Sequence, residues 1–249
     1  MVSERSHLHG GGPGRAHGVG APPRRSGLAR IERTPKLTER VLGQLRDAIV
    51  GQELAPGQPV VIEQLAEALG VSRTPIRESL PALQQLGLVE DAGSGGFRVA
   101  PLDGAYVWQV YAVRAALESL LVELVAPLLT EDDLAVLRRV SFPAEPRPGG
   151  DYCEMFGPDL ALHDFLRAKC PFGFLNALID MVQLHRSRLV DLEHSASPAH
   201  RKASYDEHRA IVEALERRDG PAARRLMQEH LDRIGTEMAR LANGGTPPR

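Results

Sequence analysis

Glycines and prolines divide residues 37–99 into short segments, and this spacing limits the folds open to that part of the chain. Apolar residues three and four positions apart predict a first amphipathic helix, which Gly51 ends, and a second, which Gly70 closes. A third helix is predicted to begin at Thr74 and Pro75, because an N-cap residue followed by proline at the first helical position is a specific start signal.

Two short strands are predicted after the third helix, which runs to Leu86. They cover residues 88–90 and 97–99, and the glycine-rich segment 92–96 joins them. Three helices followed by a glycine-tipped hairpin are the parts of a winged helix-turn-helix. The helix opened at Thr74 would then enter the major groove of double-stranded DNA, with its N-terminal residues at the base edges.

The candidate DNA-binding residues lie mainly at that N-terminus and in the hairpin. The arginine side chain fits guanine O6 and N7 and can also clamp phosphate, whereas hydroxyl groups donate to phosphate or cap the helix. Glycines in the hairpin would let the backbone approach a groove closely. The residues predicted to contact DNA are Arg46, Ser72, Arg73, Thr74, Arg77, Gly95 and Gly96.

Two features argue against tight non-specific DNA binding by this segment. Between Pro35 and Asp103, nine acidic residues outnumber six basic ones, so that a basic patch must be local. Pro81 lies inside the third predicted helix, where it removes a backbone donor and can kink the helix. Neither feature is incompatible with specific recognition of a DNA site.

Composition limits the class of protein. With 249 residues and 43% hydrophobic content, the chain is long enough for two domains. No apolar run approaches the length of a membrane span, the first residues lack the apolar core of a secretory signal, and two cysteines make no disulfide framework. These features predict a cytoplasmic protein with no membrane partner.

The two ends of the chain differ in composition from the rest. Residues 1–34 combine glycine, proline and arginine with few large apolar side chains, which predicts a disordered basic arm. Such an arm can add sequence-independent attraction to phosphates, and an inert extension is the alternative. A short disordered tail is expected at residues 244–249.

Four side chains in the second half have a spacing that suits a single metal ion. Asp159 and His163 lie four residues apart and would share one face of a helix. If residues 219–221 form the turn of a helical hairpin, His208 and His230 come level across it, within one turn of each other. Three neutral imidazoles and one carboxylate suit zinc, nickel or manganese, with positions left for water or an anionic ligand.

Such a metal site is compatible with a sensor pocket or an active site. Its net positive charge favours an anionic ligand, yet the ion could also acidify a water for hydrolysis. Hydrolysis would need a free acid or base beside the open position, and Glu207 points about 100° away from His208 on their helix. The DNA-binding module favours a regulator, and a metallohydrolase fused to a DNA anchor stays an alternative.

The first unit contains the block LAEALGVSRTPIRE at 65–78, together with LRDAIVG at 45–51, Pro56-Gly57 and LGLV at 86–89. In these motifs the chain resembles the DNA-binding domain of the GntR family of bacterial repressors. Residues 105–242 resemble the all-helical effector domain of the FadR-type branch, the FCD domain. This second resemblance rests on VRAALE at 113–118, the pair Asp159 and His163, EHRAI at 207–211, Asp219, and His230-Leu231.

The resemblance implies a mainly α fold in which a winged helix-turn-helix (35–103) is joined to an all-helical antiparallel bundle (104–243). Metal-binding members of the family use one aspartate and three histidines at matching positions, which implies that role for Asp159, His163, His208 and His230. In such members the ion orients a small organic acid that controls DNA binding.

Two further residues are candidates for contact with that acid. The resemblance implies that Arg114 faces the pocket and holds an effector carboxylate, and a structural pair with Glu118 is the alternative. His185 lies on a separate amphipathic stretch and could face the same cavity, with surface exposure as the alternative.

Together these features predict a transcriptional regulator, acting as a repressor, whose operator binding is controlled by a small carboxylate bound at a divalent metal. A regulator that senses the metal itself is the alternative. Because a single three-helix module reads too few base pairs to be selective, we expect a homodimer that presents two modules to a pseudo-palindromic operator.

Overall fold

A computed structural model of the chain describes residues 37–93, 95–142, 160–194 and 197–244. The predicted basic arm, nearly all of the predicted tail, and Asp159 lie outside these residues. In the part of the chain that is described, no helix has the length and apolar character needed to cross a membrane.

The first unit contains the three helices and the hairpin that the sequence predicts. The helices are α1 (Leu37–Val50), α2 (Ile62–Leu69) and α3 (Arg73–Gln85). Strands β1 (Val89–Asp91) and β2 (Phe97–Val99) pair antiparallel in a two-stranded sheet. The predicted helix and strand boundaries are confirmed to within one or two residues.

The predicted N-cap of α3 is wrong. The helix begins at Arg73, and Ser72 is the N-cap residue in an extended conformation, so that Pro75 occupies the third helical position rather than the first. A proline anywhere in the first turn removes an N–H that has no intrahelical partner, which explains why the helix begins earlier than the proline signal indicated. Pro81 lies inside α3, and the helix continues past it to Gln85.

Helix α3 has one buried and one exposed face. Ile76, Leu80 and Leu83 are buried in a core that α1 also supplies. The exposed face carries Arg73 and Arg77. The fold therefore presents the basic N-terminal side chains of α3 to solvent.

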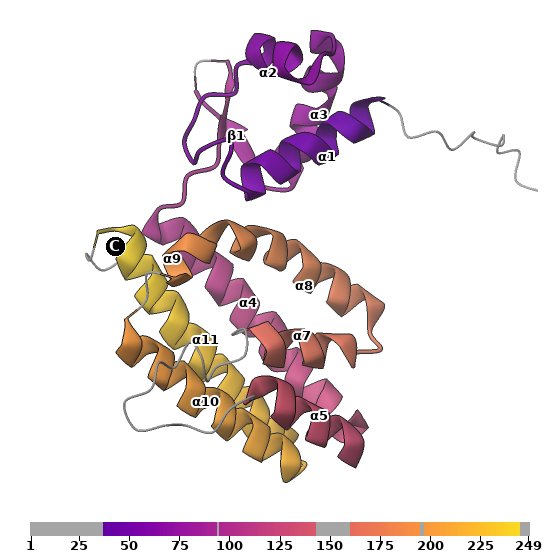
Figure 1. Cartoon of the computed structure of the whole chain (residues 1–249), viewed down its shortest axis with the longest axis vertical. Helices are drawn as coiled ribbons and strands as arrows, with labels where there is room; N and C mark the ends of the chain where they lie inside the picture. The colour runs from indigo at the N-terminus through magenta and orange to yellow at the C-terminus, as the bar shows by residue number, and fades with distance from the viewer. Residues whose placement is uncertain (1–36, 94, 143–159, 195–196, 245–249) are drawn as a thin grey trace, which may run out of the picture. The chain divides into compact units, whose positions relative to one another are not determined.

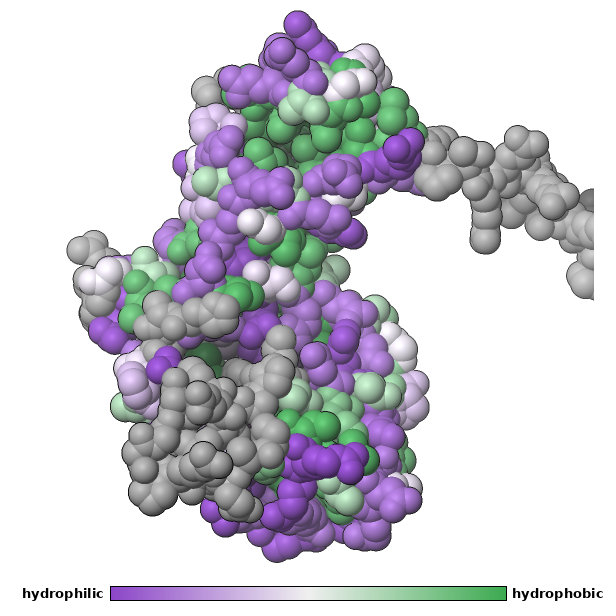
Figure 2. Space-filling view, in the orientation of Figure 1, coloured by the Kyte–Doolittle hydropathy of each residue, from purple (hydrophilic) through white to green (hydrophobic). Residues whose placement is uncertain are grey.

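The surface of this unit also has an apolar area between α1 and α2, which is green in Figure 2. It lies over a groove of about 340 Å³ that is lined in part by Leu37, Val41 and Leu69. None of the predicted DNA-binding residues lines this groove.

The rest of the described chain is helical (Figure 1). Its α-helices are α4 (Gly104–Val125), α5 (Glu131–Ser141), α7 (Leu160–Ala168), α8 (Gly173–Arg186), α9 (Val190–His194), α10 (Pro198–Glu216) and α11 (Gly220–Ala242). Short 3-10 turns follow α4 (Ala126–Leu128) and α8 (Ser187–Leu189). The helices enclose a second apolar core.

Helices α10 and α11 form the predicted hairpin. Asp219 caps α11, because its side chain accepts a hydrogen bond of 3.0 Å from the backbone N–H of Ala222. On its other side α11 packs closely against α4, and a Cβ atom at Gly235 would lie 2.6 Å from the Cβ atom of Tyr111. The hairpin and this close approach hold α4, α10 and α11 together around the histidines described next.

Candidate functional site

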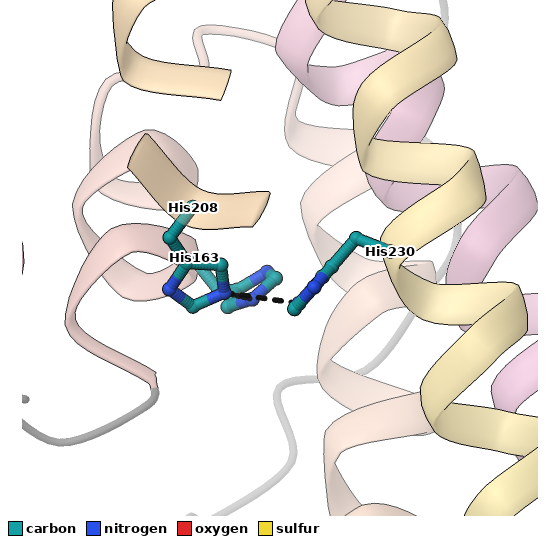
Figure 3. Close-up of side chains that lie close together, drawn as sticks. All are labelled: His163, His208 and His230. Carbon is teal, nitrogen blue, oxygen red and sulfur yellow. Dashed lines mark hydrogen bonds between the residues drawn. The ribbon is translucent and has the colours of Figure 1, made fainter. Parts of the chain in front are cut away.

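Three histidines from three helices meet in the interior of the helical part (Figure 3). His163 lies on α7, His208 on α10 and His230 on α11, and all three side chains are buried. The Nε2 atom of His208 is 3.3 Å from that of His163 and 2.9 Å from that of His230. The hairpin thus places His208 level with His230, as the spacing predicts, and α7 adds the third ring.

Carboxylates contact the far nitrogen of two of these rings. Glu118 on α4 contacts Nδ1 of His163 through Oε2, and Glu207 on α10 contacts Nδ1 of His230 at 2.7 Å. An ionised carboxylate can only accept hydrogen bonds, so both Nδ1 atoms are the donors. In a neutral ring the Nε2 atom then keeps its lone pair, and this lone pair faces the cluster.

Burial and neighbouring charges shift the pKa values of two groups at the cluster, Glu118 and His208. Burial alone would raise the pKa of Glu118, but Arg114 and His163 together bring this pKa well below its usual range. The pKa of His208 lies well below its ordinary value because the ring is buried and because a positive charge on it would lie close to the other two histidines and to Arg114. At neutral pH the cluster therefore contains an ionised carboxylate beside an uncharged His208 ring.

This arrangement fits a metal cation. The Nε2 atoms of His163 and His230 approach His208 from two sides as acceptors, and a neutral His208 can offer only one proton there. The three candidate ligand atoms lie within 4.8 Å of one another. A divalent ion would engage three lone pairs at once, provided that His208 carries its own proton on Nδ1.

The fourth predicted ligand, Asp159, lies outside the described residues, and helix α7 begins at the next residue, Leu160. The structure therefore brings together three of the four predicted ligands. The role of Asp159 stays a prediction.

The predicted effector residue Arg114 is buried beside the cluster. Its Nε atom donates to Oε1 of Glu118 at 2.6 Å, and its guanidinium group lies 5.6 Å from the ring centre of Tyr111. The pair with Glu118 that was the structural alternative is thus observed. Because Glu118 also holds His163, Arg114 is one side chain away from the histidines, and its contact with an effector stays a prediction.

The other predicted effector residue, His185, has different neighbours. Its Nδ1 atom lies 2.6 Å from the hydroxyl of Tyr106, and it is not one of the three clustered histidines. No contact recorded for the described residues links His185 to the cluster, so its role in effector binding remains a prediction without structural support.

Glu207 was missed as a partner of the site. Considered on α10 alone, it points away from His208, but it reaches His230 on the neighbouring helix. The sequence did carry a signal: a hairpin that pairs His208 with His230 also places Glu207 beside that ring. Arg233, which donates to Glu207, was missed for the same reason.

The candidate DNA-binding residues are exposed. Ser72, Arg73, Thr74 and Arg77 lie exposed at the start of α3, and the Ser72 side chain makes no capping hydrogen bond. Arg73 forms an ion pair with Glu63 at 3.1 Å, and both side chains are more than half exposed, so a phosphate could replace Glu63 at little cost.

The remaining DNA-binding candidates lie on other elements. Arg46 on α1 is paired with Asp47 at 2.8 Å, and both side chains are exposed. Gly95 and Gly96 are exposed between the strands, and Gly95 has a φ of 82°, a backbone conformation that favours glycine. The two glycines therefore lie at the tip of the hairpin, where a wing would approach a groove.

Both parts of the chain match known family models. The model described as bacterial regulatory proteins, gntR family, matches residues 37–99, and the FCD domain model matches residues 109–233. An HTH-type transcriptional regulator encoded in an unstable DNA locus of Streptomyces ambofaciens is 35% identical over 202 residues, which are 80% of this chain and 83% of the relative.

Another relative and a solved structure agree with these matches. The HTH-type transcriptional repressor RspR of Escherichia coli is 26% identical over 225 residues, or 85% of this chain and 93% of that protein. The structure of E. coli McbR/YncC has a TM-score of 0.57 at 22% identity and covers 83% of this chain and 98% of that one. The structural likeness supports the fold.

Proposed function

The chain belongs to the GntR family and carries its FCD domain, and from this premise we propose that a small carboxylate bound at a divalent metal controls its operator binding. As a member of this family, the protein is a DNA-binding transcriptional regulator and not an enzyme. One observation carries the proposal: three buried imidazoles direct Nε2 atoms at one point. Buried imidazole lone pairs that face one another are costly unless a proton or a metal cation lies between them.

The metal would be held by Nε2 of His163, His208 and His230, with Asp159 as the fourth ligand. Zinc, nickel and manganese fit this mixed nitrogen and oxygen set. With one carboxylate among the ligands, the divalent ion keeps a net positive charge and attracts an anion. A small organic acid that occupies the remaining coordination positions is the effector that this charge favours.

Arg114 would be the second anchor of the acid. It is a buried arginine beside the cluster, and its planar guanidinium group can bind a carboxylate through two hydrogen bonds. An acid bound to both the ion and Arg114 would connect α4 with α7, α10 and α11. Such an acid changes operator affinity if it binds one arrangement of the dimer better than the other.

Arg114→Lys tests this anchor. Lysine keeps a positive charge near Glu118 but lacks the planar guanidinium group that donates two parallel hydrogen bonds to a carboxylate. We therefore expect the acid concentration that gives half of the operator response to rise by about 10-fold, which corresponds to about 1.4 kcal/mol. The measurement is an acid titration of a fluorescent operator fragment at fixed metal, with metal content and acid-free operator binding recorded on the same samples. An unchanged dose-response would remove Arg114 from the effector site.

Arg77→Ala tests the recognition helix. Arg77 is exposed at the start of α3, and loss of a bidentate base contact should weaken binding to the cognate site by about 1–3 kcal/mol. Binding to unrelated DNA should change much less. Arg209→Ala on α10 is the matched control, because Arg209 is an exposed arginine paired only within its own helix in the contacts observed. If cognate affinity is unaltered in Arg77→Ala, another element reads the bases.

The proposal includes a homodimer, and α4 supplies the support for it. This helix buries one face in the core, yet its opposite face is also largely apolar, with Gln109 and Glu123 as its polar side chains. Trp108 and Val113 are 52% and 50% exposed at the edges of that face, which also carries the small side chains of Ala105, Ala112 and Ala116. A largely apolar face that is left exposed on a helix typically marks a surface where a partner binds.

A second copy of the chain is the partner that this face fits best. Small residues along its centre would let the same helix of another protomer approach closely, and a two-fold interface repeats the same surface on both sides. Such a dimer would carry two DNA-binding modules to a pseudo-palindromic operator in the cytoplasm. Action as a repressor is the mode that the likeness to RspR supports.

A regulator that senses the metal itself is the second candidate function. The same three histidines favour it, because they are sufficient to bind an ion without an acid. The two candidates differ in one respect: a metal sensor changes its operator affinity when metal is added alone, whereas an acid sensor needs the acid at constant metal.

A further inference from the structure

Glu118 connects a predicted metal ligand to a buried arginine. Its Oε2 atom accepts from Nδ1 of His163, and its Oε1 atom accepts from Nε of Arg114 at 2.6 Å. Both oxygens of the carboxylate are thus used, one on each neighbour, and the side chain is only 3% exposed. The His163 ring is therefore fixed both in its rotation and in the nitrogen that carries the proton.

Glu207 makes the same connection on the other side of the cluster. Its Oε2 atom contacts Nδ1 of His230 at 2.7 Å and also accepts from Nη2 of Arg233 at 2.8 Å, while Oε1 accepts from Nε of Arg233. Arg233 is held in turn by Ser204, whose hydroxyl lies 2.9 Å from the same Nη2 atom. The same series of contacts, from an arginine through a glutamate to a histidine, thus occurs on two sides of the three-histidine cluster.

We propose that Glu118 and Glu207 are positioning residues for the metal: each accepts the Nδ1–H of one ligand ring and thereby presents the Nε2 atom of that ring to the ion. The inference rests on the proposed metal site. Neither glutamate would touch the ion, because each reaches only the far side of a ring.

The physical reason lies in the two tautomers of imidazole. A neutral ring that is not held can carry its proton on either nitrogen, and only the form with a bare Nε2 can bind an ion in this cluster. A carboxylate on Nδ1–H selects that form and makes the ring a better electron donor. The arginine behind each glutamate keeps the carboxylate in place to do this.

The two glutamates should differ in the size of their effect. Glu118 is almost completely buried, whereas the side chain of Glu207 is 28% exposed. A hydrogen bond to a charged group is stronger where water is excluded. We therefore expect the larger loss of metal affinity from a change at Glu118.

The test compares Glu118→Gln and Glu207→Gln with the wild-type protein. Glutamine has nearly the same shape but no charge, and loss of such a supporting group typically lowers metal affinity by about 10–100-fold. Zinc affinity is measured by competition with a chromophoric chelator, and the spectrum of the cobalt-loaded protein reports ligand geometry. We expect weaker zinc binding and an altered cobalt spectrum in both variants.

Two matched controls lie on the same helices. Glu123→Gln on α4 and Glu213→Gln on α10 remove carboxylates that pair with Arg224 and Arg209, respectively. Both should leave zinc affinity and the cobalt spectrum unchanged. A general effect of lost negative charge would instead lower zinc affinity in all four variants and would overturn the inference.

A measurement on the metal-free wild-type protein needs no variant. Nitrogen-15 NMR of the histidine rings should show protonated Nδ1 and bare Nε2 atoms for His163 and His230, and the opposite tautomer would overturn the inference. If the wild-type protein binds zinc and both glutamine variants bind it equally well, the inference fails while the metal site stands. If the wild-type protein binds no ion at all, the proposed function fails and this inference fails with it.

Discussion

Replacement of His230 by alanine is expected to remove metal binding. The side chain is completely buried and supplies one of the three converging Nε2 atoms. The loss should exceed the roughly 100-fold that follows when only a supporting hydrogen bond is removed. Metal content of the purified protein and zinc affinity after chelator treatment measure it directly.

Thermal unfolding measures the loss of metal binding in a second way, through the stabilisation that added metal gives. Zinc, nickel or manganese at about 100 times its dissociation constant should stabilise the wild-type protein by about 2.7 kcal/mol through mass action. The His230→Ala protein should show no such gain. Because alanine leaves a cavity in the core, His230→Gln serves as a second variant of closer volume and should also lack the gain.

His185→Gln is the matched control for His230. His185 lies on α8 outside the three-histidine cluster and contacts Tyr106, so this variant should keep the response to metal. A wild-type protein that contains no metal and whose melting temperature ignores all three ions would contradict the site.

Introduction of a charge on the exposed face of α4 is expected to separate the proposed dimer. In Val113→Glu a carboxylate would have to be buried between two apolar helices, at a cost of several kcal/mol. Because two linked modules bind far better than one, operator affinity should fall by about 10²–10⁴-fold. Light scattering measures the molar mass, and operator titration of the same samples measures the affinity.

Leu128→Glu is the control for this prediction. Leu128 is 51% exposed, close to the 50% of Val113, but lies in the 3-10 turn after α4. This variant should remain dimeric. A Val113→Glu protein that keeps the wild-type molar mass would show that α4 does not form the interface.

The DNA-binding module could be predicted because its signals are local. Gly51, Gly70 and Gly87 end helices at the positions observed, and the apolar spacing gives the faces that are buried. The start of α3 was misplaced for an equally local reason. Ser72 and Thr74 are both good N-cap residues, and Pro75 is acceptable in any position of the first turn, so the sequence alone did not choose between them.

The histidine cluster could be predicted only in part. Counting outward from the turn at Asp219 placed His208 and His230 level, because a tight hairpin fixes the register of two helices. The contact between Glu118 and His163 joins residues 45 positions apart on helices that are not consecutive. No periodicity within one helix indicates which residue a distant helix will meet, so Glu118 became visible as a supporting carboxylate only in the folded chain.

The most direct test of the proposed function is an operator titration at constant metal. Metal-loaded protein is titrated into a fluorescent DNA fragment from upstream of its own gene, with and without each of a panel of small mono- and dicarboxylates. We predict that at least one acid shifts the operator affinity by about 100-fold, or 2.7 kcal/mol, and that chelator-treated protein shows no shift. If no carboxylate changes the affinity while metal alone does, acid sensing is contradicted and the protein is a metal sensor.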